Sequence, residues 1–180
     1  DDVIQFYDLN TGVIDNEVSF GLLSGKGSGS YHINDCWLEG ESLFFTYFSK
    51  TGYWRNEMFD GGVSVLNISS GVIAELITGL FQPHSPIIHE NELYFCESTM
   101  GKLFRGSHST IFESNGFLRG VGFYGDFIVF AQSETLYLNR VKNKNHLMLN
   151  SGIYLFNEKS KLARFYPTLG LKNIHQLIVL

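Results

Sequence analysis

Apolar and polar residues alternate over most of the chain, in short runs separated by Gly, Asn, Asp or Ser. Alternation with a period of two predicts half-buried β-strands, whereas an amphipathic helix would place apolar residues every three to four positions. No stretch of useful length has the helical period. The pattern therefore predicts an all-β fold, with residues 1–180 as a single domain.

The predicted strands follow a repeat. A strand, a tight polar turn and a more apolar strand occur three times, and each of these pairs is followed by a further hairpin. The three units cover residues 31–77, 83–112 and 117–166, and the outer hairpin of the second unit is the shortest. Residues 3–18 have the same hairpin form without a preceding strand pair, and residues 174–180 predict a lone inner strand.

A repeated four-stranded unit is typical of a β-propeller, because each antiparallel sheet covers the face of its neighbour. The repeat predicts a propeller or partial propeller of four-stranded antiparallel blades, with about three complete blades and partial blades at both ends. A β-sandwich would explain the strand content but not the repeated inner pair and outer hairpin. The partial blades leave two alternatives: a closed four-bladed ring with both ends in one sheet, or part of a larger propeller that self-associates through open sheet edges.

Polar residues occupy matching places in successive repeats: His32, His84, Arg119 and, one unit further on, His175. Inner strands of a propeller surround a central channel, so residues at matching places converge at one mouth of that channel. A second cluster lies in the insertion at 50–61, where aromatic and charged residues suit a rim over a ligand. The predicted ligand-binding residues are His32, Asn34, Trp54, Arg55, His84, Ser85 and Arg119.

These residue types support two functions. An arginine can hold a carboxylate or phosphate through two hydrogen bonds, which suits a ligand-binding or protein-interaction propeller without catalysis. Alternatively, His32, His84 and His175 would hold a divalent metal in a metal-assisted lyase or hydrolase acting on an acidic small molecule or saccharide, with Arg119 neutralising the substrate. A third interpretation is purely structural, with the polar side chains bonding neighbouring blades. None of the standard enzyme motifs occurs.

Charge and composition narrow the expected partners to a small anionic molecule or another protein. The formal net charge of −5 disfavours a nucleic-acid partner, because phosphate binding needs a basic surface. The longest apolar run, residues 127–131, is far too short to cross a bilayer, so we expect no membrane partner. Cys36 and Cys96 lack the spacing of a zinc or redox pair, which favours free thiols in the cytoplasm. The loop at 133–150 carries a local basic patch that could contact an acidic partner.

Five short motifs follow one another along the chain. They are His32-Ile33-Asn34-Asp35, Gly52-Tyr53-Trp54-Arg55 with Gly61-Gly62, Pro83-His84-Ser85-Pro86, Phe117-Leu118-Arg119-Gly120 and Ser151-Gly152-Ile153. With these motifs the sequence resembles an uncharacterised, mostly bacterial β-propeller family, the domain of unknown function 4915. Asp35 stands where the family has Gly, and residues 173–176 replace a Tyr-Asp pair. The resemblance implies a shortened relative or the C-terminal portion of a longer propeller, and it supplies no reaction.

Overall fold

The computed structural model describes residues 2–21, 29–107, 109–134 and 150–180, and nearly all of the regular structure there is β-strand. A one-turn 3-10 helix, η1 (Trp54–Asn56), lies in the predicted insertion. No helix among the described residues is both long and apolar enough to cross a membrane. The predicted all-β fold is confirmed. The basic residues of the patch predicted within 133–150 lie outside the described residues.

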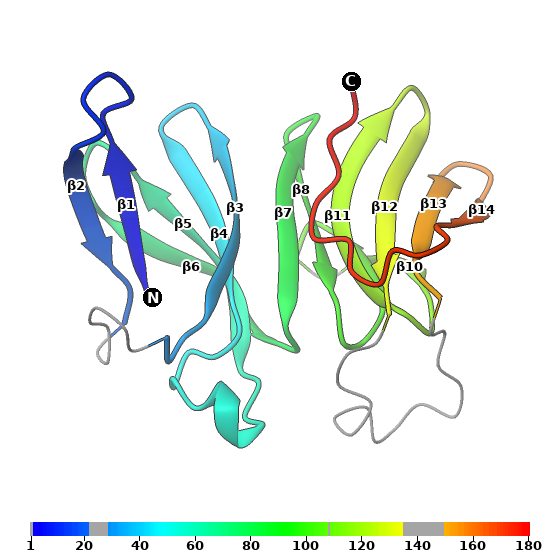
Figure 1. Ribbon diagram of the computed structural model, residues 1–180, viewed down its shortest axis with the longest axis horizontal. Coiled ribbons are helices and arrows are strands. Elements are labelled where there is room, and N and C mark those ends of the chain that lie inside the picture. Colours follow the sequence, from blue (N-terminus) through cyan, green and yellow to red (C-terminus); the bar gives the residue numbers. More distant parts are fainter. Residues whose placement is uncertain (1, 22–28, 108, 135–149) are drawn as a thin grey trace.

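The strands form four antiparallel sheets, arranged side by side in chain order (Figure 1). The first sheet is a hairpin, and each of the others has four strands joined in sequence. In order, the sheets contain β1 (Val3–Tyr7) and β2 (Ile14–Ser19); β3 (Ile33–Glu39), β4 (Ser42–Tyr47), β5 (Gly61–Asn67) and β6 (Ile73–Leu80); β7 (Pro83–His89), β8 (Glu92–Glu97), β9 (Lys102–Arg105) and β10 (Ser109–Glu113); and β11 (Phe117–Tyr124), β12 (Phe127–Ser133), β13 (Gly152–Asn157) and β14 (Leu162–Pro167).

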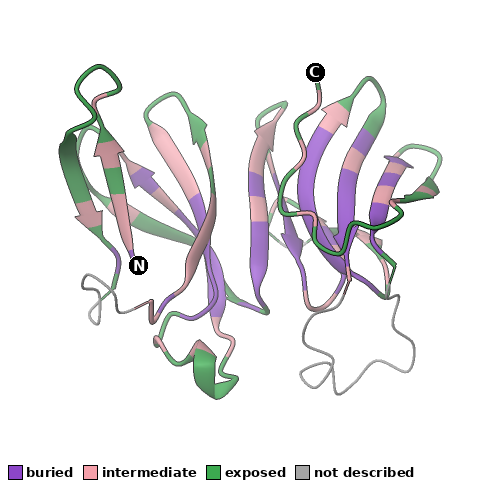
Figure 2. Cartoon of the chain, viewed as in Figure 1, coloured by how far each residue is buried: buried purple, intermediate pink, exposed green. Residues whose placement is uncertain are grey.

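The hydrophobic core is divided into layers between neighbouring sheets. Aromatic and aliphatic side chains of the hairpin pack on β3–β6, a second layer joins that sheet to β7–β10, and a third joins β7–β10 to β11–β14. Burial is greatest along β5, β8, β11 and β12 and least along the hairpin and β14 (Figure 2). A sheet with a core layer on each face is not part of a two-layer sandwich, so the sandwich alternative is wrong.

The C-terminal segment differs from the prediction. Residues 171–180 form no strand, although their apolar pattern predicted one at 174–180. Point contacts hold the segment instead: Ser133 Oγ bonds both the N–H and the C=O of Ile174, at 2.9 and 3.0 Å, and the N–H of Glu134 donates to Lys172 O at 2.9 Å. In Figure 1 the segment runs beside β11, whereas the N-terminal hairpin lies at the opposite side of the molecule. The alternative of a ring closed by both ends in one sheet is therefore wrong.

Candidate functional site

The inner strands β3, β7 and β11 lie next to one another, and their pairing defines which residues are equivalent. Ile33, Pro83 and Leu118 each pair with the sixth residue of the following strand. The residues that follow them, Asn34, His84 and Arg119, are therefore equivalent. His32 was predicted to match His84 but lies two residues earlier. The ladder shifts register just after each of these positions, and this irregularity is invisible in the sequence.

A row of rings nevertheless brings His32 and His84 to the same end of the inner strands. The His32 imidazole stacks on Phe48, with ring centres 4.2 Å apart, and lies 4.6 Å from the Trp54 ring. Phe48 contacts His84 edge-on at 5.1 Å, and His84 contacts Phe117 at 5.7 Å. The row thus crosses from the insertion and β3 to β7 and β11.

The row ends in an arginine and a second histidine. The Arg119 guanidinium lies over the Phe117 ring at 4.9 Å, and its Nη1 is 2.7 Å from His175 Nδ1. Because guanidinium only donates hydrogen bonds, His175 Nδ1 accepts this one, and the ring proton of a neutral His175 lies on Nε2. We name the group formed by His32, Trp54, Arg55, His84, Arg119 and His175 the mouth cluster.

His84 is the most enclosed member of the mouth cluster, with 3% of its surface exposed. Its Nδ1 lies 3.0 Å from Gln82 O and 2.8 Å from Ser98 Oγ. A carbonyl oxygen only accepts, so the contact with Gln82 places the ring proton on Nδ1. Burial, followed by the positive charge of Arg119, holds the pKa of His84 well below its ordinary value. His84 is therefore a neutral, fixed part of the wall behind the mouth.

His32 is half-buried and lies in a positive field. Burial is the largest cause that lowers its pKa, and the charge of Arg55 is the second; Arg119 adds to the same effect. The Asp2 carboxylate opposes them more weakly, and it also accepts hydrogen bonds from the backbone N–H groups of residues 30–32. The loop that carries His32 is thus held in place by a buried acid.

Trp54 and Arg55 form the outer rim. The Trp54 indole N–H donates to Gly29 O at 2.8 Å, and Arg55 Nη1 donates to the same oxygen at 3.2 Å. The Arg55 guanidinium lies 4.8 Å from the centre of the Trp54 ring, within the range of a cation–π contact. One backbone oxygen therefore fixes both side chains at the edge of the mouth cluster.

Asn34 and Ser85 were predicted to contact a ligand, but in the structure their polar groups form hydrogen bonds between the inner strands. Asn34 Nδ2 donates to Pro83 O at 3.2 Å, and its Oδ1 accepts from Thr46 Oγ1 and from the Asp35 N–H. Ser85 Oγ accepts from the Gly120 N–H at 2.7 Å and donates to Asp35 Oδ2 at 3.2 Å. Both residues tie the inner strands together.

The predicted metal ligands do not form a set. Among the residues that the structure describes, no group of three or more His, Cys, Asp or Glu side chains is arranged to hold a metal ion. His84 is enclosed and bonded through Nδ1, and His175 Nδ1 is bonded to Arg119. This geometry corrects the expectation that His32, His84 and His175 share a divalent ion.

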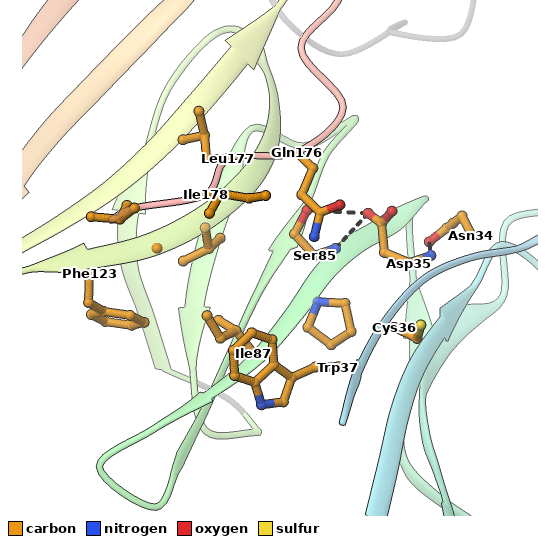
Figure 3. A pocket seen from close by; sticks show the side chains of 14 residues that line it. Asn34, Asp35, Cys36, Trp37, Ser85, Ile87, Phe123, Gln176, Leu177 and Ile178 are labelled. Atoms are coloured by element: carbon orange, nitrogen blue, oxygen red, sulfur yellow. Dashed lines mark hydrogen bonds between the residues drawn. The ribbon is translucent and has the colours of Figure 1, made fainter. Parts of the chain in front are cut away.

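Sequence reasoning missed two kinds of residue. Phe48 and Phe117 connect the polar members of the mouth cluster. The repeat gave no signal for Phe48, because the matching places in the next two sheets carry Ser98 and Ser133. Asp35 joins β3 to β7 and lines a cavity of about 450 Å³ that extends along the inner strands beyond Ser85 (Figure 3). Two signals were available: an acid in the middle of a predicted inner strand, and its place where the resembled family has Gly.

Residues 29–161 match a family described as domain of unknown function (DUF4915). A search of curated proteins found no match. Among solved structures, the chain is similar to the crystal structure of the computationally designed Ika8 protein (crystal packing No.1 in P63), with a TM-score of 0.52 and 11% sequence identity. That alignment covers 97% of this chain and 46% of the designed one, so this chain spans about half the length of the protein it matches. At this identity the similarity concerns the fold alone.

The family match covers all five motifs on which the resemblance rested, so the resemblance is confirmed. The chain belongs to the family of domain of unknown function 4915.

Proposed function

We propose that the three four-stranded sheets are consecutive blades of a β-propeller and that the mouth cluster binds a small anionic molecule without catalysing a reaction. The propeller assignment is supported by the repeated topology, in which the first strand of each sheet lies innermost and contacts its counterpart in the next sheet. The function rests on the mouth cluster.

The observation that carries the function is that Arg55 and Arg119 lie at the two ends of the row of rings that contains His32. Arg55 comes from the insertion after β4, and Arg119 comes from β11, yet both disfavour a positive charge on His32. Guanidinium groups remain charged at any working pH, so their fields add at this place. An anion bound between them would lower the electrostatic energy of the whole cluster.

The surroundings also fit an anion. His175 Nε2 is left with a proton to donate, because Nδ1 accepts from Arg119. Trp54 offers an apolar surface beside these donors, which suits the carbon skeleton of a small carboxylate. Two acids lie near the cluster: Asp2 accepts from backbone N–H groups and Asp35 accepts from Ser85, so hydrogen bonds already offset part of their charge.

Isothermal titration calorimetry with citrate and with inorganic phosphate tests the proposal. Arg119→Gln removes one guanidinium from the mouth cluster, and we expect it to weaken binding by roughly tenfold or more, since a charge-assisted hydrogen bond contributes about 1.5–3 kcal/mol. Arg164→Gln is the matched control, because it makes the same change of charge on β14, where Arg164 lies over Tyr166. Absence of binding to either anion, or equal weakening by the two variants, would overturn the proposal.

A further inference from the structure

The cavity beyond the mouth cluster has a polar end and apolar walls. Asn34, Asp35 and Ser85 form the polar end. The walls come from β3, β7, β11 and the C-terminal segment, and they include Trp37, Ile87, Val121, Phe123, Leu177 and Ile178. Figure 3 shows the Asp35 carboxylate beside Ser85 and Gln176, with the Trp37 and Phe123 rings further along. A volume of about 450 Å³ lies within the usual range for small-molecule sites.

Asp35 is the one charged residue among the described residues that line this cavity. Its Oδ2 accepts from the Ser85 N–H at 2.9 Å and from Ser85 Oγ at 3.2 Å. Within the described part of the chain, Asp35 forms no ion pair, and no other side chain donates to its carboxylate. One serine thus fixes the orientation of the carboxylate while Oδ1 is left for a further donor.

A carboxylate in such surroundings needs a counter-ion. Ionised groups removed from water are costly unless they are paired and hydrogen-bonded. Burial raises the pKa of Asp35, and the hydrogen bonds from Ser85 and the charges of Arg119 and His175 offset this by smaller amounts. Asp35, Ser85 and Gly120 each come directly after a member of the Asn34, His84 and Arg119 layer, and the Ser85 hydroxyl bonds both of the others.

We propose that this cavity binds a protonated primary amine with an apolar body, the ammonium group donating to Asp35 Oδ1 and the apolar body lying between Trp37, Phe123 and the C-terminal segment. An ammonium group supplies both the missing charge and the missing donor. The aromatic rings add a favourable surface for the carbon atoms next to a cation. A neutral apolar ligand would pack against the apolar walls but would leave the Asp35 carboxylate without a counter-ion. The site is separate from the mouth cluster and takes the opposite charge.

Phenethylamine is a suitable probe, with 2-phenylethanol as its neutral counterpart, and binding is measured by tryptophan fluorescence in a Trp54→Phe background, where Trp37 is the remaining indole. We expect phenethylamine to bind more tightly than the alcohol. Asp35→Asn keeps an oxygen for the Ser85 donors, and we expect it to weaken amine binding roughly 10- to 100-fold, as expected for a charge-assisted hydrogen bond, with little effect on the alcohol.

Asp126→Asn is the matched control, because it removes one carboxylate from the exposed turn between β11 and β12. It should leave amine binding unchanged. Ile178→Arg gives a second test that does not disturb the core, since 82% of the Ile178 surface is exposed although the residue lines the cavity. The introduced cation should abolish amine binding. Equal binding of the amine and the alcohol, or unchanged amine binding in Asp35→Asn or Ile178→Arg, would overturn the proposal, and citrate binding at the mouth would not be affected by that result.

Discussion

Substitution of Ser85 by alanine tests the hydrogen bonds that join the three inner strands. The Ser85 hydroxyl donates to Asp35 Oδ2 at 3.2 Å and accepts from the Gly120 N–H at 2.7 Å, so one oxygen bridges β3, β7 and β11. Ser85→Ala removes both bonds and keeps the Ser85 N–H bond to Asp35. Within the described residues, no other side chain bonds both Asp35 and the Gly120 N–H.

The expected loss of stability follows from the two bonds. Leaving the Gly120 N–H without its acceptor costs about 1–3 kcal/mol, and the longer bond to Asp35 contributes about 1 kcal/mol more. The free energy of unfolding should therefore fall by about 2–4 kcal/mol. Ser85 has a φ of +56°, and glycine adopts this conformation without strain. Ser85→Gly should therefore be less destabilising than Ser85→Ala by about 1 kcal/mol.

Urea unfolding followed by circular dichroism measures this change, provided that the dependence on urea is the same in all variants. Ser70→Ala is the matched control, because the Ser70 hydroxyl donates to Asn67 in an exposed turn and its loss should cost less than about 0.5 kcal/mol. If Ser85→Ala were no more destabilising than Ser70→Ala, the bridge between the inner strands would contribute nothing, and the structural argument would fail.

Three further predictions concern acid, the C-terminal segment and the outer sheet. Because folding lowers the pKa of His84, the unfolded chain takes up a proton that the native chain does not, so the free energy of unfolding should fall as the pH drops from 7 through about 6.5 and below. The pKa of His32 is lowered too and acts in the same direction. His84→Gln should reduce the slope of the urea midpoint plotted against pH, and an unchanged slope would show that the pKa of His84 is the same in the folded and unfolded chain. Gly120→Ala should lower the free energy of unfolding by at least about 1 kcal/mol more than Gly125→Ala does, because both glycines have positive φ but only a Cβ at 120 would contact another residue, 2.8 Å from Leu177 N. Equal losses of stability in the two variants would contradict the close packing of the C-terminal segment on β11. Val129 and Leu155 are half-buried on the face of β12 and β13 that is turned away from the core. We expect this face to cause concentration-dependent self-association, measured by sedimentation velocity, and Leu155→Glu to prevent it. A wild-type protein that is a monomer at all concentrations would contradict this.

The strands were predictable because burial in a sheet imposes the period of two directly on the sequence. The second strand of each inner pair was predicted from its correct first residue, because a turn marks that end. β4 was predicted at its observed bounds, whereas the predictions 92–96 and 127–131 ended one and two residues before the ends of β8 and β12. The apolar pattern at 174–180 was misleading, because a strand also needs a partner edge. There Gly120 has positive φ and β11 changes register, so the segment is held by point contacts instead.

The members of the mouth cluster were also predictable in part. Their polar character at the start of each inner strand was visible, but the match of His32 with His84 was wrong. The residues eight positions before the first residue of β4, β8 and β12 are Asn34, His84 and Arg119. Whether a side chain faces a ligand or a neighbouring strand depends on three-dimensional partners. Asn34 and Ser85 are bonded between strands for that reason, while Asp35 lines the cavity without having been selected from the sequence.

The pKa of His32 with and without citrate, measured by NMR at constant ionic strength, tests the central claim most directly. Burial is the largest cause that lowers this pKa, and the charges of Arg55 and Arg119 lower it further, so a bound anion that neutralises these charges should raise it. Constant ionic strength excludes simple screening as the cause. In Arg119→Gln the pKa should be higher without citrate and should respond less to it. The account predicts a rise in the wild-type protein that citrate saturates, and a His32 pKa that does not change with citrate would contradict it.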